Sequence, residues 1–133
     1  LAQHLNVTPD LISAIGLASF LGHLYPVFYK FEGGKGVATA LGVLLALHWP
    51  LGLAVIGIWL VVFAAFRISS LGSLIAFTAA PVIAWTLVPS YMLGVMGMSV
   101  LLIARHKNNI KALLKGEERK FGVDKKSEPT EAD

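Results

Sequence analysis

Hydrophobic residues gather along this chain into five runs that turn-forming residues separate. The runs cover residues 11–25, 37–48, 51–66, 70–87 and 91–104. Pro50, Pro89 and a glycine-rich segment mark breaks between them, because proline and glycine interrupt helices. Several runs are shorter than the ~20 residues that usually cross a bilayer. The pattern therefore predicts an all-α polytopic membrane bundle of five short spans.

The alternative joins the second and third runs into one helix over residues 37–66, kinked at Pro50. The basic residues separate the two interpretations. With five spans, the connections at 27–36 and 67–69 and the segment after residue 104 share one side, which then holds all 11 Lys and Arg residues. The fused helix would move Arg67 to the other side. We therefore expect five spans, with the basic side in the cytoplasm, as the positive-inside rule requires.

Composition agrees with a membrane protein, since 56% of the residues are apolar, 14% are charged and the mean hydropathy is +0.71. Soluble domains carry about 25% charged residues. The chain has no cysteine, and no His/Glu cluster has metal-ligand spacing. We expect no metal, no other cofactor and no nucleic-acid partner. The first residue is Leu1, so we expect that an amino-terminal piece is missing. We divide the chain into a membrane domain, 1–116, and a charged, mostly disordered tail, 117–133.

The segment Gly33-Gly34-Lys35-Gly36 joins the first two runs and has the composition of an anion site. Glycine reaches positive φ and leaves its amide uncovered, and several such amides beside an ammonium form a concave anion site. The terminus of the helix expected from Val37 adds partial positive charge. We predict a bound phosphate or carboxylate here. The alternative is a plain glycine turn whose lysine marks the cytoplasmic side; the spacing is not that of a Walker A loop.

Residues 105–115 repeat with helical periodicity. Two polar and two apolar side chains share one arc: His106, Asn109, Ile110 and Leu113. Three lysines share the opposite arc and suit anionic lipid headgroups or solvent: Lys107, Lys111 and Lys115. Polar groups on the apolar side need partners. Two interpretations stay open, because His106 and Asn109 can cross-link helix ends or can point at the anion of the glycine segment.

Other positions carry weaker signals. His23 ends the first run, where it could brace the glycine segment or touch a ligand, and a structural role is the commoner one. Ser69 and Ser70 could cap the fourth helix. Small residues at every fourth position of the first run predict a face that packs closely on another helix: Ala14, Ala18 and Gly22. No nucleophile adjoins a histidine and an acid, so any catalysis would rest on positioning and charge neutralisation.

Two stretches resemble signature blocks of one family. Gly22-His23-Leu24-Tyr25-Pro26, continued by Gly33-Gly34-Lys35-Gly36-Val37-Ala38-Thr39, resembles the second block of the bacterial acyl-phosphate-dependent glycerol-3-phosphate acyltransferases, the PlsY family. A second stretch, His106-x-x-Asn109-Ile110 with Gly116 and Glu118 downstream, resembles the third block of the same family. The family's first block, a Ser/Gly/Asn-rich loop with an arginine, is absent from these residues together with two spans around it. We therefore expect the 133 residues alone to be inactive.

The resemblance implies a seven-span enzyme of the bacterial inner membrane, surrounded by membrane lipid, with its active site on the cytoplasmic side. It would transfer a fatty acyl group from acyl phosphate to the 1-hydroxyl of glycerol 3-phosphate, giving lysophosphatidate and phosphate for phospholipid synthesis. By position it assigns phosphate binding to Gly33, Gly34, Lys35, Gly36 and Thr39. It assigns catalysis to Lys35, His106 and Asn109, with His23 and Glu118 in support. A transporter subunit for an organic phosphate is the alternative, and a purely structural subunit is a third.

Overall fold

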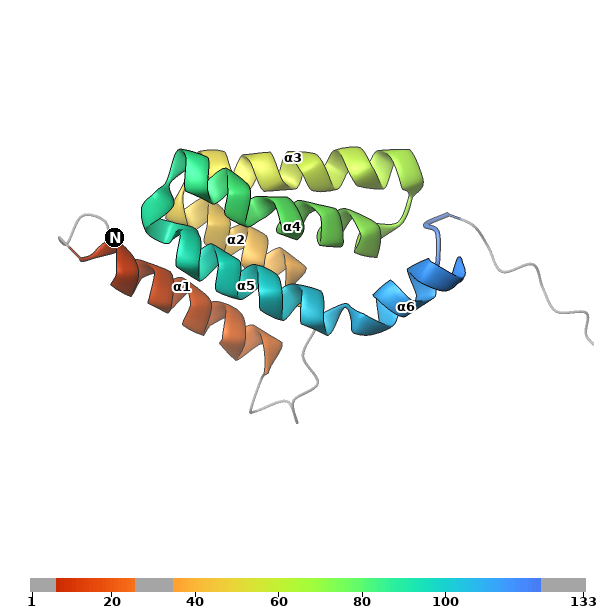
Figure 1. The fold of residues 1–133 in the computed structure, drawn as a ribbon, viewed down its shortest axis with the longest axis horizontal. Helices are drawn as coiled ribbons and strands as arrows, with labels where there is room; N and C mark the ends of the chain where they lie inside the picture. The colour runs from red at the N-terminus through yellow and green to blue at the C-terminus, as the bar shows by residue number, and fades with distance from the viewer. Residues whose placement is uncertain (1–6, 26–34, 123–133) are drawn as a thin grey trace, which may run out of the picture.

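The computed structural model describes residues 7–25 and 35–122, and in these residues it contains helices and no strand (Figure 1). The helices are α1 (Pro9–Leu24), α2 (Val37–Leu47), α3 (Trp49–Phe66), α4 (Ser69–Leu87), α5 (Met92–Arg105) and α6 (Lys107–Lys115), and a 3-10 turn, η3 (Pro89–Tyr91), precedes α5. The five helices predicted from the hydrophobic runs are confirmed, with ends that shift by two residues or fewer. The amphipathic segment after them forms α6.

The second and third runs form separate helices, so the fused alternative is wrong. His48 between them has an extended backbone, with φ −157° and ψ 102°. Pro50 lies in the first turn of α3, where a missing amide proton breaks no helical hydrogen bond. The chain therefore reverses between α2 and α3, and Arg67 stays on the side where the charge distribution placed it.

Helix lengths agree with short spans. α3 and α4 are long and apolar enough to cross a membrane, whereas α1, α2 and the segment Pro89–Arg105 are apolar but shorter. At 1.5 Å per residue, α2 rises only about 16 Å. Large apolar side chains are exposed along the outside of the bundle, as Val61 (70%) and Leu93 (78%) show. Exposed apolar side chains of this size suit contact with lipid.

The spanning helices form a closed ring in which each packs on the next and α1 packs on α5 (Figure 1). Successive helices run in opposite directions, so the carboxyl ends of α1, α3 and α5 meet the amino ends of α2 and α4. We call this the basic end, because Lys35, Arg67 and Arg105 all lie there. The opposite end holds Asp10 and His48 and no Lys or Arg among the described residues.

Inward-facing side chains of all five spanning helices form one core. Its fully buried members include Phe20, Leu24, Leu44, Leu51, Val55, Phe77, Met98 and Leu102. The small-residue face predicted for α1 is wrong, since Ala14, Ala18 and Gly22 are exposed. The helix instead buries Gly16, where an added Cβ would lie 2.8 Å from Val43. The larger apolar surface of Phe20 and Leu24 on this second face decides which side turns inward.

Candidate active site at the basic end

Gly36 begins α2 in a conformation that favours glycine. It is buried, its φ is +77°, and its carbonyl accepts the amide hydrogen of Ala40 at 2.8 Å. An added Cβ would lie 2.5 Å from Cε2 of Phe20 and 3.3 Å from a methyl carbon of Leu24. The positive φ predicted for the glycine segment is confirmed at this position. Gly33 and Gly34 lie outside the described residues.

Lys35 precedes Gly36 and is exposed, and Thr39 lies half-buried in the first turn of α2. The amides of the first helical turn have no intrahelical acceptor, and no side chain among the described residues caps them. This helix terminus carries partial positive charge. Together with the Lys35 ammonium it forms a surface that suits an anion.

His106 lies at the junction of α5 and α6 and is only 1% exposed. Its Nδ1 lies 2.8 Å from the carbonyl oxygen of Leu102. Because a carbonyl oxygen can only accept, Nδ1 must carry the proton of this hydrogen bond. In the neutral ring Nε2 is then the acceptor.

The pKa of His106 is lowered, chiefly because burial disfavours the imidazolium, and the Lys35 ammonium lowers it further. The hydrogen bond to Leu102 and the Glu118 carboxylate oppose the shift only in part. Lys35 and Glu118 are the two charged side chains that act on the pKa of this ring. Lys35 and His106 are 71 positions apart in the sequence, and the structure places both at the basic end of the bundle.

Asn109 and Glu118 are joined directly. Nδ2 of Asn109 donates to Oε1 of Glu118 at 2.6 Å, and the Ser70 hydroxyl donates to the same oxygen. Ser70 belongs to α4 and is buried, so Glu118 fastens α6 to the start of α4. We call His106, Asn109, Glu118 and Ser70 the polar cluster.

The capping role expected of Ser69 and Ser70 is wrong. Ile68 is the N-cap residue of α4, and no side chain caps it. Ser70 bonds instead to Glu118, 48 positions away, and local sequence carries no signal for so distant a contact. The cross-linking expected of His106 and Asn109 is observed for Asn109, whose partner Glu118 also bonds to Ser70 of α4, whereas His106 bonds to Leu102 within α5. Each keeps one further polar atom for a ligand, Nε2 of His106 and the amide oxygen of Asn109.

His23 is exposed in the last turn of α1, and no contact with the polar cluster is found for it in the described residues. Tyr25, which ends this helix, places its ring 5.5 Å below the Arg105 guanidinium. This cation–π contact ties α1 to the end of α5. His23 therefore lies at the basic end beside the site, and not in the polar cluster.

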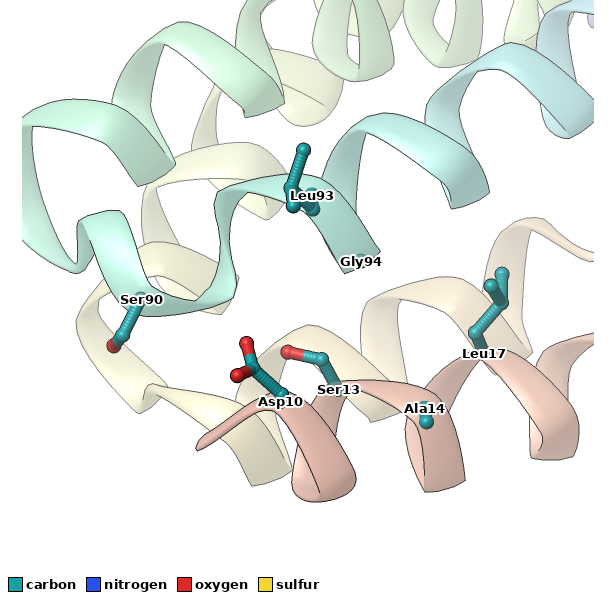
Figure 2. A pocket seen from close by; sticks show the side chains of 7 residues that line it. All are labelled: Asp10, Ser13, Ala14, Leu17, Ser90, Leu93 and Gly94. Carbon is teal, nitrogen blue, oxygen red and sulfur yellow. The ribbon is translucent and has the colours of Figure 1, made fainter. Parts of the chain in front are cut away.

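A hollow of about 370 Å³ opens at the opposite end, between α1 and the beginning of α5 (Figure 2). Asp10, Ser13, Ala14, Leu17, Ser90, Leu93 and Gly94 line it. α1 and α5 approach closely beside it, since a Cβ on Gly94 would lie 2.9 Å from that of Ser13. None of the residues predicted from the sequence to form the site lines this hollow. The candidate site is thus the polar surface at the basic end.

Replacing Glu118 by alanine is expected to destabilise the protein by about 1–3 kcal/mol, because Ser70 and Asn109 would both lose their acceptor. Glu118→Gln should recover much of this loss, since its amide oxygen can still accept. Thermal unfolding of the detergent-solubilised protein measures the effect. The adjacent Glu117 is exposed and Glu117→Ala is the matched control. Equal unfolding midpoints for Glu118→Ala and Glu117→Ala would contradict the contact.

The lowered pKa of His106 predicts a pH-dependent stability. The unfolded state binds the proton more readily than the folded state, so stability is fully present above the unfolded pKa of about 6.5. It is lost as the pH falls from that value through the lower folded pKa. The difference in unfolding midpoint between the native chain and His106→Gln should therefore shrink as the pH falls from about 7.5 to about 5. A difference that stays constant over this pH range would show that burial does not lower the pKa of His106.

Comparison with known proteins gives concordant results. The family model described as glycerol-3-phosphate acyltransferase matches residues 1–116. A protein of that name from Methylococcus capsulatus is 54% identical over 125 residues, which cover 92% of this chain and 63% of the relative. One from Methylobacillus flagellatus is 53% identical over 126 residues, with the same two coverages. The chain thus spans less than two thirds of the length of these relatives.

Two crystal structures of PlsY, described as an integral membrane glycerol 3-phosphate acyltransferase, have a similar fold. One is a glycerol 3-phosphate form and the other a lysophosphatidic acid form. Each is 41% identical to this chain and superposes with a TM-score of 0.79. The match covers 83% of this chain and 56% of the glycerol 3-phosphate form.

Proposed function

The chain belongs to the glycerol-3-phosphate acyltransferase family, and we propose that the whole protein transfers a fatty acyl group from acyl phosphate to the 1-hydroxyl of glycerol 3-phosphate. The products would be lysophosphatidate for phospholipid synthesis and inorganic phosphate. The observation that carries the proposal is that Lys35, the start of α2 and the polar cluster all lie at one end of a membrane helix bundle. The collection of cations at this end favours the cytoplasmic side of a bacterial inner membrane.

Charge neutralisation is the first task of such a site. Both proposed substrates carry a phosphate, and they must approach each other despite like charge. The Lys35 ammonium, the uncapped amides of α2 and Gly36 would hold one phosphate. Thr39 stands one helical turn further on and could add its hydroxyl. Donors fixed in this way stabilise the charge that develops in the transition state.

Orientation of the hydroxyl is the second task, and we assign it to His106 and Asn109. With Nδ1 of His106 bonded to Leu102, Nε2 can accept a hydrogen bond from the 2-hydroxyl of glycerol 3-phosphate, which orients the adjacent 1-hydroxyl and leaves its proton free for transfer. The hydroxyl oxygen attacks the carbonyl carbon of acyl phosphate, and the bond from that carbon to the phosphate oxygen breaks. We propose that a phosphate oxygen takes the hydroxyl proton. Glu118 and Ser70 would hold Asn109 in place.

The pH dependence of the rate tests this last step. If a substrate phosphate takes the proton, kcat should not follow the titration of His106, and His106→Asn should change the size of kcat without changing the shape of its pH profile. A profile for the native enzyme that loses one titration in this variant would make His106 the base. Either result leaves the acyltransferase assignment intact.

Activity of the full-length protein tests the proposal as a whole. Incubation with acyl phosphate and glycerol 3-phosphate should release phosphate and form lysophosphatidate, both of which are measured directly. Movement of glycerol 3-phosphate across vesicles without product would favour the transporter alternative. If the protein neither forms product nor transports glycerol 3-phosphate, the result would favour the purely structural subunit. The placement of the polar groups at one end, rather than midway along the helices, favours the enzyme.

A further inference from the structure

Three lysines follow one side of α6 and form a continuous positive ridge. Lys107, Lys111 and Lys115 recur every four residues and are all exposed. We call them the lysine ridge. Within the described part of the chain, none of their ammonium groups has a hydrogen bond or ion pair. Their charge is therefore available to an external partner.

An exposed leucine adjoins this ridge. Leu114 is 84% exposed, and it follows Lys107 by seven positions, which places the two within about 20° around the helix. Phe121, just beyond α6, is 68% exposed, and Phe66 at the end of α3 is 55% exposed. A soluble acidic partner would explain the lysines and leave these apolar side chains in water. A lipid surface takes both, because lysines reach the phosphates while apolar side chains enter the acyl layer.

The position of α6 sets its depth. It follows α5 after the single residue His106. Beyond its other end, the Phe121 amide donates to the carbonyl oxygen of Arg67 at 2.7 Å, and the rings of Phe121 and Phe63 meet edge to face with centroids 5.8 Å apart. Both ends of α6 are thus tied to ends of membrane helices. These contacts place the lysine ridge at the basic end of the bundle, next to the ends of the membrane helices.

We propose that the lysine ridge binds the headgroup phosphates of anionic phospholipids, with Leu114 inserted among the acyl chains beside them. The inference does not depend on the proposed reaction. A juxtamembrane lysine contributes roughly a fivefold preference for an anionic surface. Three lysines on one helix face should make the preference of this protein for acidic over zwitterionic lipid large enough to measure.

Retention of lipid by the full chain tests the proposal. The chain is purified in mild detergent and offered equal amounts of phosphatidylglycerol and phosphatidylcholine, and native mass spectrometry counts the lipids that remain bound. Replacement of the three ridge lysines by glutamine should lower the ratio of bound phosphatidylglycerol to phosphatidylcholine about tenfold or more. Raising the ionic strength should lower the ratio of the native chain in the same direction. Leu114→Gln should reduce retention of both lipids.

A control with the same loss of charge replaces Lys120, Lys125 and Lys126 by glutamine, and it should keep the native ratio. Thermal unfolding shows that both variants are folded. If the ridge variant keeps its preference for phosphatidylglycerol, or the control loses as much, the ridge is not the binding surface and the proposal is overturned.

Discussion

Replacing Lys35 by alanine in the full-length protein is expected to lower kcat/KM for glycerol 3-phosphate by about 30- to 1000-fold. This corresponds to the roughly 2–4 kcal/mol of transition-state stabilisation that one well-placed donor supplies. The ammonium stands beside the uncapped start of α2 and lowers the pKa of His106. When the ammonium is lost, only the partial positive charge of the helix terminus remains to offset the repulsion between the two phosphates.

The control for this experiment is Lys120→Ala, which removes an exposed lysine from the same end of the molecule. It should leave kcat/KM within about twofold, since an exposed charge outside the polar cluster is largely screened by salt. Lys35→Arg should recover part of the rate, because it restores the charge with a different geometry. Equal rates for Lys35→Ala and Lys120→Ala would remove Lys35 from the site.

Gly36→Ala is expected to destabilise the protein by about 2–5 kcal/mol. The left-handed conformation costs a residue with a Cβ about 1–2 kcal/mol. The new methyl would also lie 2.5 Å from the buried ring of Phe20, and overpacking of this kind costs about 1–3 kcal/mol. Thermal unfolding in detergent should show a midpoint lower by several degrees.

Gly42 provides a matched control in the same helix. A Cβ built on it meets nothing within 4 Å, and alanine is about 1 kcal/mol better than glycine in a helix interior. Gly42→Ala should therefore unfold at the native temperature or above it. If Gly36→Ala unfolded at the same midpoint as Gly42→Ala, the start of α2 would not have the backbone described here.

The helices were predictable because proline and charge mark their ends. Pro50 is tolerated in the first turn of a helix but disrupts an interior, and the eleven basic residues place the connections at 27–36 and 67–69 and the segment after residue 104 on one side. The inward face of α1 was not predictable, because two sets of residues have helical spacing. Small residues at Ala14, Ala18 and Gly22 favoured one face, and the bulk of Phe20 and Leu24 places the other in the core.

The candidate site was predictable where its residues share one helix or one loop. Helical periodicity places His106 and Asn109 on one arc, and glycine chemistry indicates Gly36. Ser70 escaped prediction because its partner Glu118 reaches it only after α6 turns the chain back toward α4. A serine near the start of a helix has the same sequence pattern whether it caps that helix or bonds to a distant side chain.

The central claim is that Lys35 and the polar cluster act on the same reacting groups. A double-mutant cycle on kcat/KM of the full-length enzyme, with Lys35→Ala, His106→Ala and the double variant, measures this directly. We predict an interaction free energy of about 1 kcal/mol or more, because residues that share a partner are not additive. Effects that add within about 0.3–0.5 kcal/mol would mean that the two side chains work independently, and would contradict a common site.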